Sequence, residues 1–259
     1  MPIFDTIPLW TFFIFCILIA MLCVEAGLEL GKRHRPEVAD NHAPIASIVG
    51  SALGLLAFML AFTFSIAAAR FEDRRQLVVQ DANAIRSTYL LADYLDQPGR
   101  ESVKNTLRQY VNLRVTGLKQ ADTVAQTFSK AEDLENQMWV HAIIFGQKHP
   151  TSQFGALFTK ALNELINVNT RRATARLRAR VPEGIWLALF VVAALSLAGV
   201  GYYCGLGGRR SWPARIMLVA SFATVMLLVA DLDRPGEGTI RVSQEPLEDL
   251  SRQIGQPTQ

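Results

Sequence analysis

The chain alternates long apolar runs with polar segments, and four of the runs are long enough to cross a membrane. They occupy residues 7–27, 44–69, 184–206 and 212–230. A helix rises about 1.5 Å per residue and a bilayer's hydrocarbon core is roughly 30 Å thick, so about 20 apolar residues span it. The pattern therefore predicts four transmembrane helices, of which the fourth has the shortest strictly apolar stretch.

The second apolar run is longer than a bilayer requires. Residues 44–69 would form about 39 Å of helix. Apolar positions then recur with a helical spacing of seven, four, three and four residues, at Phe71, Val78, Ala82, Ile85 and Tyr89. We therefore expect the second span to continue as one helix out of the membrane and to end at the Asp-Gln-Pro-Gly sequence of residues 96–99.

The segment between the second and third spans, residues 70–183, shows helical periodicity and no strand-like alternation. We expect further helices at 99–125, at 129–149, where Ser129 and Glu132 match a capping box, and from Thr151 or Ser152 to Arg180. The chain is thus predicted to be an all-α membrane protein with a cytosolic helical bundle inserted between spans two and three. The expected divisions are residues 1–69, 70–183, 184–232 and a cytosolic tail at 233–259.

Composition narrows the class of protein. Half of the residues are hydrophobic and only 19% are charged, which is unusual for a soluble protein. The net charge of +3 is too small to suggest a nucleic-acid partner. The cysteines, Cys16, Cys23 and Cys204, lie in apolar runs, and no metal-ligand spacing, phosphate-binding loop or catalytic motif occurs. We therefore expect no enzyme activity, no cofactor and no metal site.

The arginines and lysines near the span ends predict the orientation. Ten lie on the side of the insert and of the segment after the fourth span, and six lie on the opposite side. The excess predicts that the insert and both termini are cytoplasmic. No Lys or Arg precedes the first run, so we interpret that run as a retained span. Five arginines within residues 171–180 either mark the cytoplasmic side and contact anionic headgroups or form a basic vestibule that concentrates anions.

One face of the second span could line a pore. Phe58, Phe62 and Ile66 are each four residues apart, so they share a helix face. Repeated around a central axis, such residues would form a hydrophobic constriction that gates by dewetting. Alternatively, the phenylalanines pack between helices or face lipid. Gly50 and Gly54, also four apart, are candidates for close helix packing.

A few acidic and basic residues lie at span ends. Glu25 falls in the last turn of the first span, where a carboxylate is costly unless it is paired or hydrated. Asp231, Asp233 and Arg234 follow the fourth span. We interpret these four residues as structural or interface groups.

The sequence resembles the bacterial bestrophin-like domain family, whose members are four-span membrane proteins. The resembling stretches are EAGLELG at 25–31, FTF at 62–64 followed by RFEDRRQLVVQDANAIRSTYL at 70–90, and DLDRP at 231–235 with IRV at 240–242 and PL at 246–247. Together with the four-span layout, the resemblance covers most of the chain.

The resemblance implies a function. Bestrophins are pentameric anion channels whose second span lines the pore with apolar and aromatic rings, and Phe58, Phe62 and Ile66 would be the matching positions here. It implies a homo-oligomeric ion channel of a bacterial inner membrane, with membrane lipids and a permeant anion as its other partners. No acidic cluster matches the calcium clasp of animal bestrophins. The alternative is a membrane-anchored sensor or scaffold whose helical bundle binds a protein partner.

Overall fold

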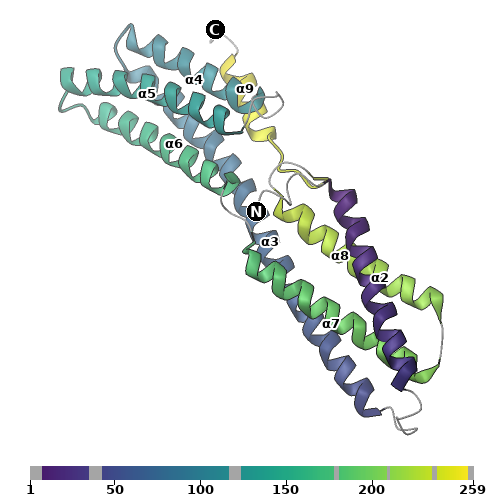
Figure 1. Cartoon of the computed structure of the whole chain (residues 1–259). Coiled ribbons are helices and arrows are strands. Elements are labelled where there is room, and N and C mark those ends of the chain that lie inside the picture. Colours follow the sequence, from purple (N-terminus) through teal and green to yellow (C-terminus); the bar gives the residue numbers. More distant parts are fainter. Residues whose placement is uncertain are drawn as a thin grey trace. The chain divides into compact units, whose positions relative to one another are not determined.

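The structure is a computed structural model that describes residues 8–34, 43–116, 124–177, 181–208, 211–234 and 238–255. Every regular element in these ranges is helical. The elements are α2 (Leu9–His34), α3 (Ala43–Leu91), the short 3-10 helix η1 (Ala92–Tyr94), α4 (Gly99–Thr116), α5 (Val124–Lys148), α6 (Gln153–Leu177), α7 (Glu183–Gly207), α8 (Trp212–Asp233) and α9 (Glu245–Gly255) (Figure 1).

The chain divides into two compact units. Unit 1 comprises residues 1–71 and 180–241, and unit 2 comprises residues 72–179 and 242–259. Four of the helices are long and apolar enough to cross a membrane, namely α2, α3, α7 and α8, which confirms the four predicted spans. In unit 1, α2 contacts both α7 and α8 (Figure 1). Apolar side chains such as Val24, Leu189 and Met226 are fully buried between these helices.

Glycines bring the backbones of α2 and α7 into direct contact. A Cβ atom on Gly27 would lie 1.9 Å from the carbonyl oxygen of Ala198, and one on Gly201 would lie 2.0 Å from that of Val24. Gly31 and Gly205 make the same kind of approach one turn further along. Small residues allow this spacing between membrane helices, where close packing replaces the hydrophobic effect as the source of association.

Helix α3 continues without a break for 49 residues. This confirms the prediction that the second apolar run extends into a longer helix. Its apolar stretch belongs to unit 1, and its second half contributes Val78, Ala82, Ile85 and Tyr89 to the core of unit 2.

Unit 2 is a bundle built from the second half of α3 together with α4, α5, α6 and α9. Helix α5 packs against α4 and α6, and α9 lies along α4 (Figure 1). Helix α9 buries Leu247, Leu250 and Ile254 in the same core as the other helices. Its carbonyl oxygen at Ile254 accepts a hydrogen bond of 2.9 Å from Arg108 Nε. This helix is not among the elements expected from the sequence.

One expected helix start is wrong. Helix α4 is described as far as Thr116, residues 117–123 lie outside the described residues, and α5 already includes Val124. Ser129 therefore lies inside α5 rather than at its start, so it cannot form a capping box with Glu132. The start expected near Ser152 is confirmed, because its hydroxyl oxygen accepts a hydrogen bond of 3.2 Å from the backbone nitrogen of Gly155.

Candidate functional site

The apolar half of α3 exposes most of its surface within the single chain. Only 6% of its most apolar stretch is buried, compared with 33% for α2, 28% for α7 and 44% for α8. Phe58 and Phe62 are 66% and 50% exposed, and their rings stack with centroids 6.4 Å apart and planes inclined by 13°. The two stacked phenylalanines thus keep half or more of their surface exposed within the chain.

The opposite face of α3 is buried against the same chain. Leu56, Thr63 and Ala67 are 5% exposed or less, and the Thr63 hydroxyl donates a hydrogen bond of 2.7 Å to the carbonyl oxygen of Met59. Ile66 is half-buried and packs against the cluster that contains Val229. The structure therefore separates the three predicted pore residues, because Ile66 is half-buried against its own chain and the two phenylalanines are exposed.

Gly50 and Gly54 lie on the exposed face of α3 with the phenylalanines. A Cβ atom on either glycine would meet no described atom within 4 Å. Within one chain, close helix packing occurs instead at the glycines of α2 and α7. A packing role for Gly50 and Gly54 stays a prediction, and it requires a second subunit.

The carboxylate of Glu25 forms an ion pair with the guanidinium of Arg215, which joins α2 to α8. Arg215 is 4% exposed, and its guanidinium lies 5.0 Å from the centre of the Trp212 ring. The pair offsets part of the cost of placing a charge at the end of an apolar span. Glu25 therefore connects two helices of its own chain.

Asp231 and Asp233 hold neighbouring segments of backbone. Asp231 accepts hydrogen bonds from the backbone nitrogens of Thr239 at 3.0 Å and Ile240 at 3.3 Å. Asp233 accepts one of 2.9 Å from the backbone nitrogen of Val181. Both aspartates and the adjacent Arg234 are 8% exposed or less. These contacts lie within one chain and position the backbone at the end of α8.

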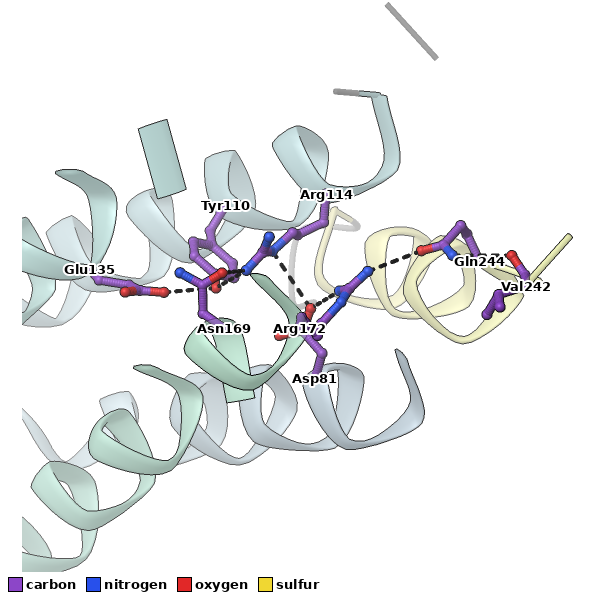
Figure 2. Close-up of polar contacts among 8 residues, drawn as sticks. All are labelled: Asp81, Tyr110, Arg114, Glu135, Asn169, Arg172, Val242 and Gln244. Atoms are coloured by element: carbon purple, nitrogen blue, oxygen red, sulfur yellow. Dashed lines mark hydrogen bonds and ion pairs between the residues drawn. The ribbon is translucent and has the colours of Figure 1, made fainter. Parts of the chain in front are cut away.

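A buried ion network connects the helices of unit 2 (Figure 2). At its centre is Asp81 of α3, whose side chain is fully buried. Its carboxylate pairs with Arg172 of α6, and its Oδ2 lies 3.6 Å from Nε of Arg114 on α4. Arg172 also donates a hydrogen bond of 3.3 Å to the side chain of Gln244, in the segment before α9.

The network extends from Arg114 to a buried glutamate. Arg114 donates a hydrogen bond of 2.7 Å to the Tyr110 hydroxyl and another to the side-chain oxygen of Asn169. The Tyr110 hydroxyl in turn donates one of 2.9 Å to Glu135 of α5 (Figure 2). Burial raises the pKa of Glu135 to about 7, although Tyr110, Arg114 and Asn169 act to lower it. The network thus includes a carboxyl group that titrates near neutral pH.

The network is not among the sites expected from the sequence, although the sequence carries one signal of it. Asp81 lies three residues after Val78 and four before Ile85, so it falls on the apolar face of the helical stripe. A charged residue on a core-facing stripe indicates a buried partner of opposite charge. The sequence does not show which arginines supply this opposite charge, because Arg114 and Arg172 follow Asp81 by 33 and 91 residues.

Replacing Glu135 with glutamine is expected to change the pH dependence of stability. The folded-state pKa of about 7 exceeds the ordinary value of 4.5. Between these pH values the folded protein binds more protons than the unfolded one, so stability falls as pH rises through this window. The full loss is about 3 kcal/mol above pH 7. Glutamine cannot ionise, so Glu135→Gln removes this loss of stability. The variant should therefore unfold at a higher temperature than wild type at pH 8.5 and at a similar temperature at pH 5.

Thermal unfolding of the detergent-solubilised protein between pH 4.5 and 8.5 measures this effect. Glu132→Gln is the matched control, because Glu132 is exposed on the same helix, and its profile should follow wild type. Identical pH profiles for wild type and Glu135→Gln would show that Glu135 does not titrate in this window.

Comparisons with known proteins agree with the architecture. The model of the bestrophin-like domain matches residues 9–247. A crystal structure of a single-residue variant of a bacterial bestrophin homologue from Klebsiella pneumoniae superposes with a TM-score of 0.65 at 15% identity, covering 94% of this chain and 99% of that one. A second crystal structure of a Klebsiella pneumoniae bestrophin homologue gives a TM-score of 0.63 at 16% identity, with 95% and 99% covered. No curated protein gives a significant match. Because the family model covers nearly the whole chain, this protein belongs to the bestrophin-like domain family.

Proposed function

We propose that the protein is a homo-oligomeric ion channel in which the exposed face of α3 lines the pore. Copies of α3 surround a central axis, and Phe58 and Phe62 of each copy form stacked hydrophobic rings that gate by dewetting. Ile66, one turn further along, continues the constriction as a less exposed third ring. The assembly is a pentamer, and an anion is the permeant species.

The observation that carries this proposal is the unequal burial of the four apolar helices. An apolar helix that is 6% buried must find its partners outside the chain, in lipid or in other subunits. If lipid were the only partner of this face, any apolar side chains would be suitable there. The exposed face instead combines small residues with two phenylalanines, and four-residue spacing of small residues favours close contact between helices. Membership of the bestrophin-like domain family also supports other subunits, rather than lipid alone, as the partners of this face.

We further propose a bacterial inner-membrane location, with unit 2 and both termini in the cytoplasm. The distribution of arginine and lysine supports this orientation, since ten of the sixteen near span ends lie on the side of residues 70–183. Single-cysteine labelling at Glu132 and at Lys32 in intact cells tests it. Glu132 should be protected from a membrane-impermeant reagent, and Lys32 should react with it.

Truncating the phenylalanines is expected to increase current. Purified wild-type protein in planar bilayers should conduct, and Phe58→Ala or Phe62→Ala should raise the current per channel by about tenfold, since losing an aromatic ring from every subunit lowers the barrier by about 1.4 kcal/mol or more. Particle images of the solubilised protein should show a ring of subunits with α3 innermost.

Phe64→Ala is the matched control for these recordings. Phe64 is 37% exposed on the same helix, but it points about 120° or more away from Phe58 and Phe62. Its variant should conduct like wild type. The proposal fails if wild type carries no current, if all three variants behave alike, or if the particle is a monomer or dimer.

A further inference from the structure

The bundle of unit 2 exposes an apolar patch where α6 meets η1. The rings of Tyr94 and Phe154 stack with centroids 4.0 Å apart and planes inclined by 8°. Leu90 lies four residues before Tyr94, and Leu157 lies three residues after Phe154, so both lie beside the ring pair. The four side chains are between 48% and 56% exposed. We call this surface the aromatic patch.

A second apolar patch lies on α5. Its members, Val140, Ile143 and Ile144, are three and four residues apart, so they share one face of the helix. They are between 47% and 56% exposed, whereas Met138 and Ala142 of the same helix are buried in the core. We call this surface the aliphatic patch. Contiguous apolar surface of this kind marks a site of interaction with another molecule.

The two patches point in different directions but lie near the same end of the bundle. Phe154 faces η1, whereas the next residue, Gly155, faces the Phe145 ring of α5. A short turn joins α5 to α6, so the last two turns of α5, which carry Ile143, lie at the level of the first two turns of α6, which carry Leu157. One copy of the chain therefore presents both patches at one level along its helices.

The charged residues beside the two patches have opposite signs. Arg86 lies one turn before Leu90 on the same face of α3, and Asp133 lies two turns before Val140 on the same face of α5. Both are exposed. Helices α3 and α5 each run antiparallel to α6 and hence parallel to each other. The arginine and the aspartate therefore lie in the same direction from their patches, and their charges are complementary.

We propose that the aromatic patch of one copy of this chain docks on the aliphatic patch of the next copy. A contact between two different patches of the same chain is head-to-tail, and its repetition closes a ring when the rotation returns to the first copy. Rotation about an axis along the helices joins residues at the same level, which both patches occupy, and it brings Arg86 of one copy toward Asp133 of the next.

A second copy fits these surfaces better than an unrelated protein does. Each copy carries one patch of each kind, so a closed ring covers every aromatic patch and every aliphatic patch at once. A single partner of another kind would cover one patch and leave the other exposed to water, which is unfavourable for apolar surface. The inference rests on the ring of subunits in the proposed function, and it names the surfaces through which the bundles of unit 2 hold that ring together.

Cysteine cross-linking of the full-length protein in detergent tests the contact. Two differently tagged chains are co-expressed, one with Leu157→Cys in the aromatic patch and the other with Ile143→Cys in the aliphatic patch. A short bismaleimide should give a covalent dimer that carries both tags. Either variant expressed alone should give none, because like patches do not meet. The wild type supplies the background, since its cysteines, Cys16, Cys23 and Cys204, lie in α2 and α7.

Further variants locate the contact. Glu101→Cys, used in place of Ile143→Cys, is the matched control, because Glu101 is exposed on α4 outside both patches, and it should give no mixed dimer. Arg86→Glu in both chains should lower the yield of mixed dimer by about two- to fivefold, the effect of an exposed charge pair. Adding Asp133→Arg should restore the yield, because the two charges are then exchanged and still complementary.

The proposal is overturned if the co-expressed pair gives no mixed dimer, if either variant alone cross-links as efficiently as the pair, or if the Glu101→Cys control does so. No readout depends on current. A ring of subunits without the mixed dimer would contradict this contact alone, whereas a mixed dimer in a protein that carries no current would contradict conduction alone.

Discussion

Replacing Asp81 with alanine is expected to destabilise unit 2 by about 3–5 kcal/mol. The side chain of Asp81 is fully buried, and it is the carboxylate that Arg114 and Arg172 share. Removing it would leave two largely buried guanidinium groups facing each other without a negative charge between them. Hydrogen–deuterium exchange of the full-length protein should show loss of protection in peptides from α4, α5 and α6, together with a lower unfolding temperature.

Two further variants distinguish loss of the ion pair from loss of a side chain. Asp73→Ala, at an exposed position on the same helix, should change stability by no more than about 0.5 kcal/mol. Combining Asp81→Ala with Arg172→Leu should recover part of the loss, since the second change removes one of the charges left unpaired. If the loss of stability in the double variant equals the sum of the losses in the two single variants, the coupling between Asp81 and Arg172 is refuted.

Replacing Gly201 with alanine is expected to cost about 3 kcal/mol, the upper end of the range for overpacked interiors. The added Cβ would lie 2.0 Å from the carbonyl oxygen of Val24 and 2.9 Å from the backbone nitrogen of Leu28. Both contacts are with backbone, which cannot rotate away as a side chain can. Helices α2 and α7 would therefore have to separate along their length. A lower unfolding temperature in detergent and reduced protein yield measure the effect.

Gly207→Ala is the control for this substitution. Gly207 lies in the same helix, and a Cβ atom there meets nothing within 4 Å. Alanine should be neutral or stabilising by about 0.5–1 kcal/mol, because it favours the helix more than glycine does. Equal effects of the two substitutions would mean that the contact between α2 and α7 is not limiting for stability.

The candidate pore face was only partly predictable. The four-residue spacing of Phe58, Phe62 and Ile66 correctly places them along one side of α3, but their exposure differs because Ile66 packs onto neighbouring residues of its own chain. Likewise, the four-residue glycine pairs of α2, α3 and α7 look alike in the sequence. The structure shows that the pairs of α2 and α7 meet each other, whereas Gly50 and Gly54 meet nothing within the chain.

The sequence by itself determined the four apolar helices, the unbroken length of α3 and the helical nature of the segment between the second and third spans. These features depend on hydrophobicity and on the 3.6-residue period, which are properties of neighbouring residues. Only the tertiary structure decided that Asp81 would meet Arg114 and Arg172, that Glu25 would meet Arg215 and that α9 would complete the bundle. Those contacts join residues far apart in the chain, and their energies depend on burial, which no local pattern fixes.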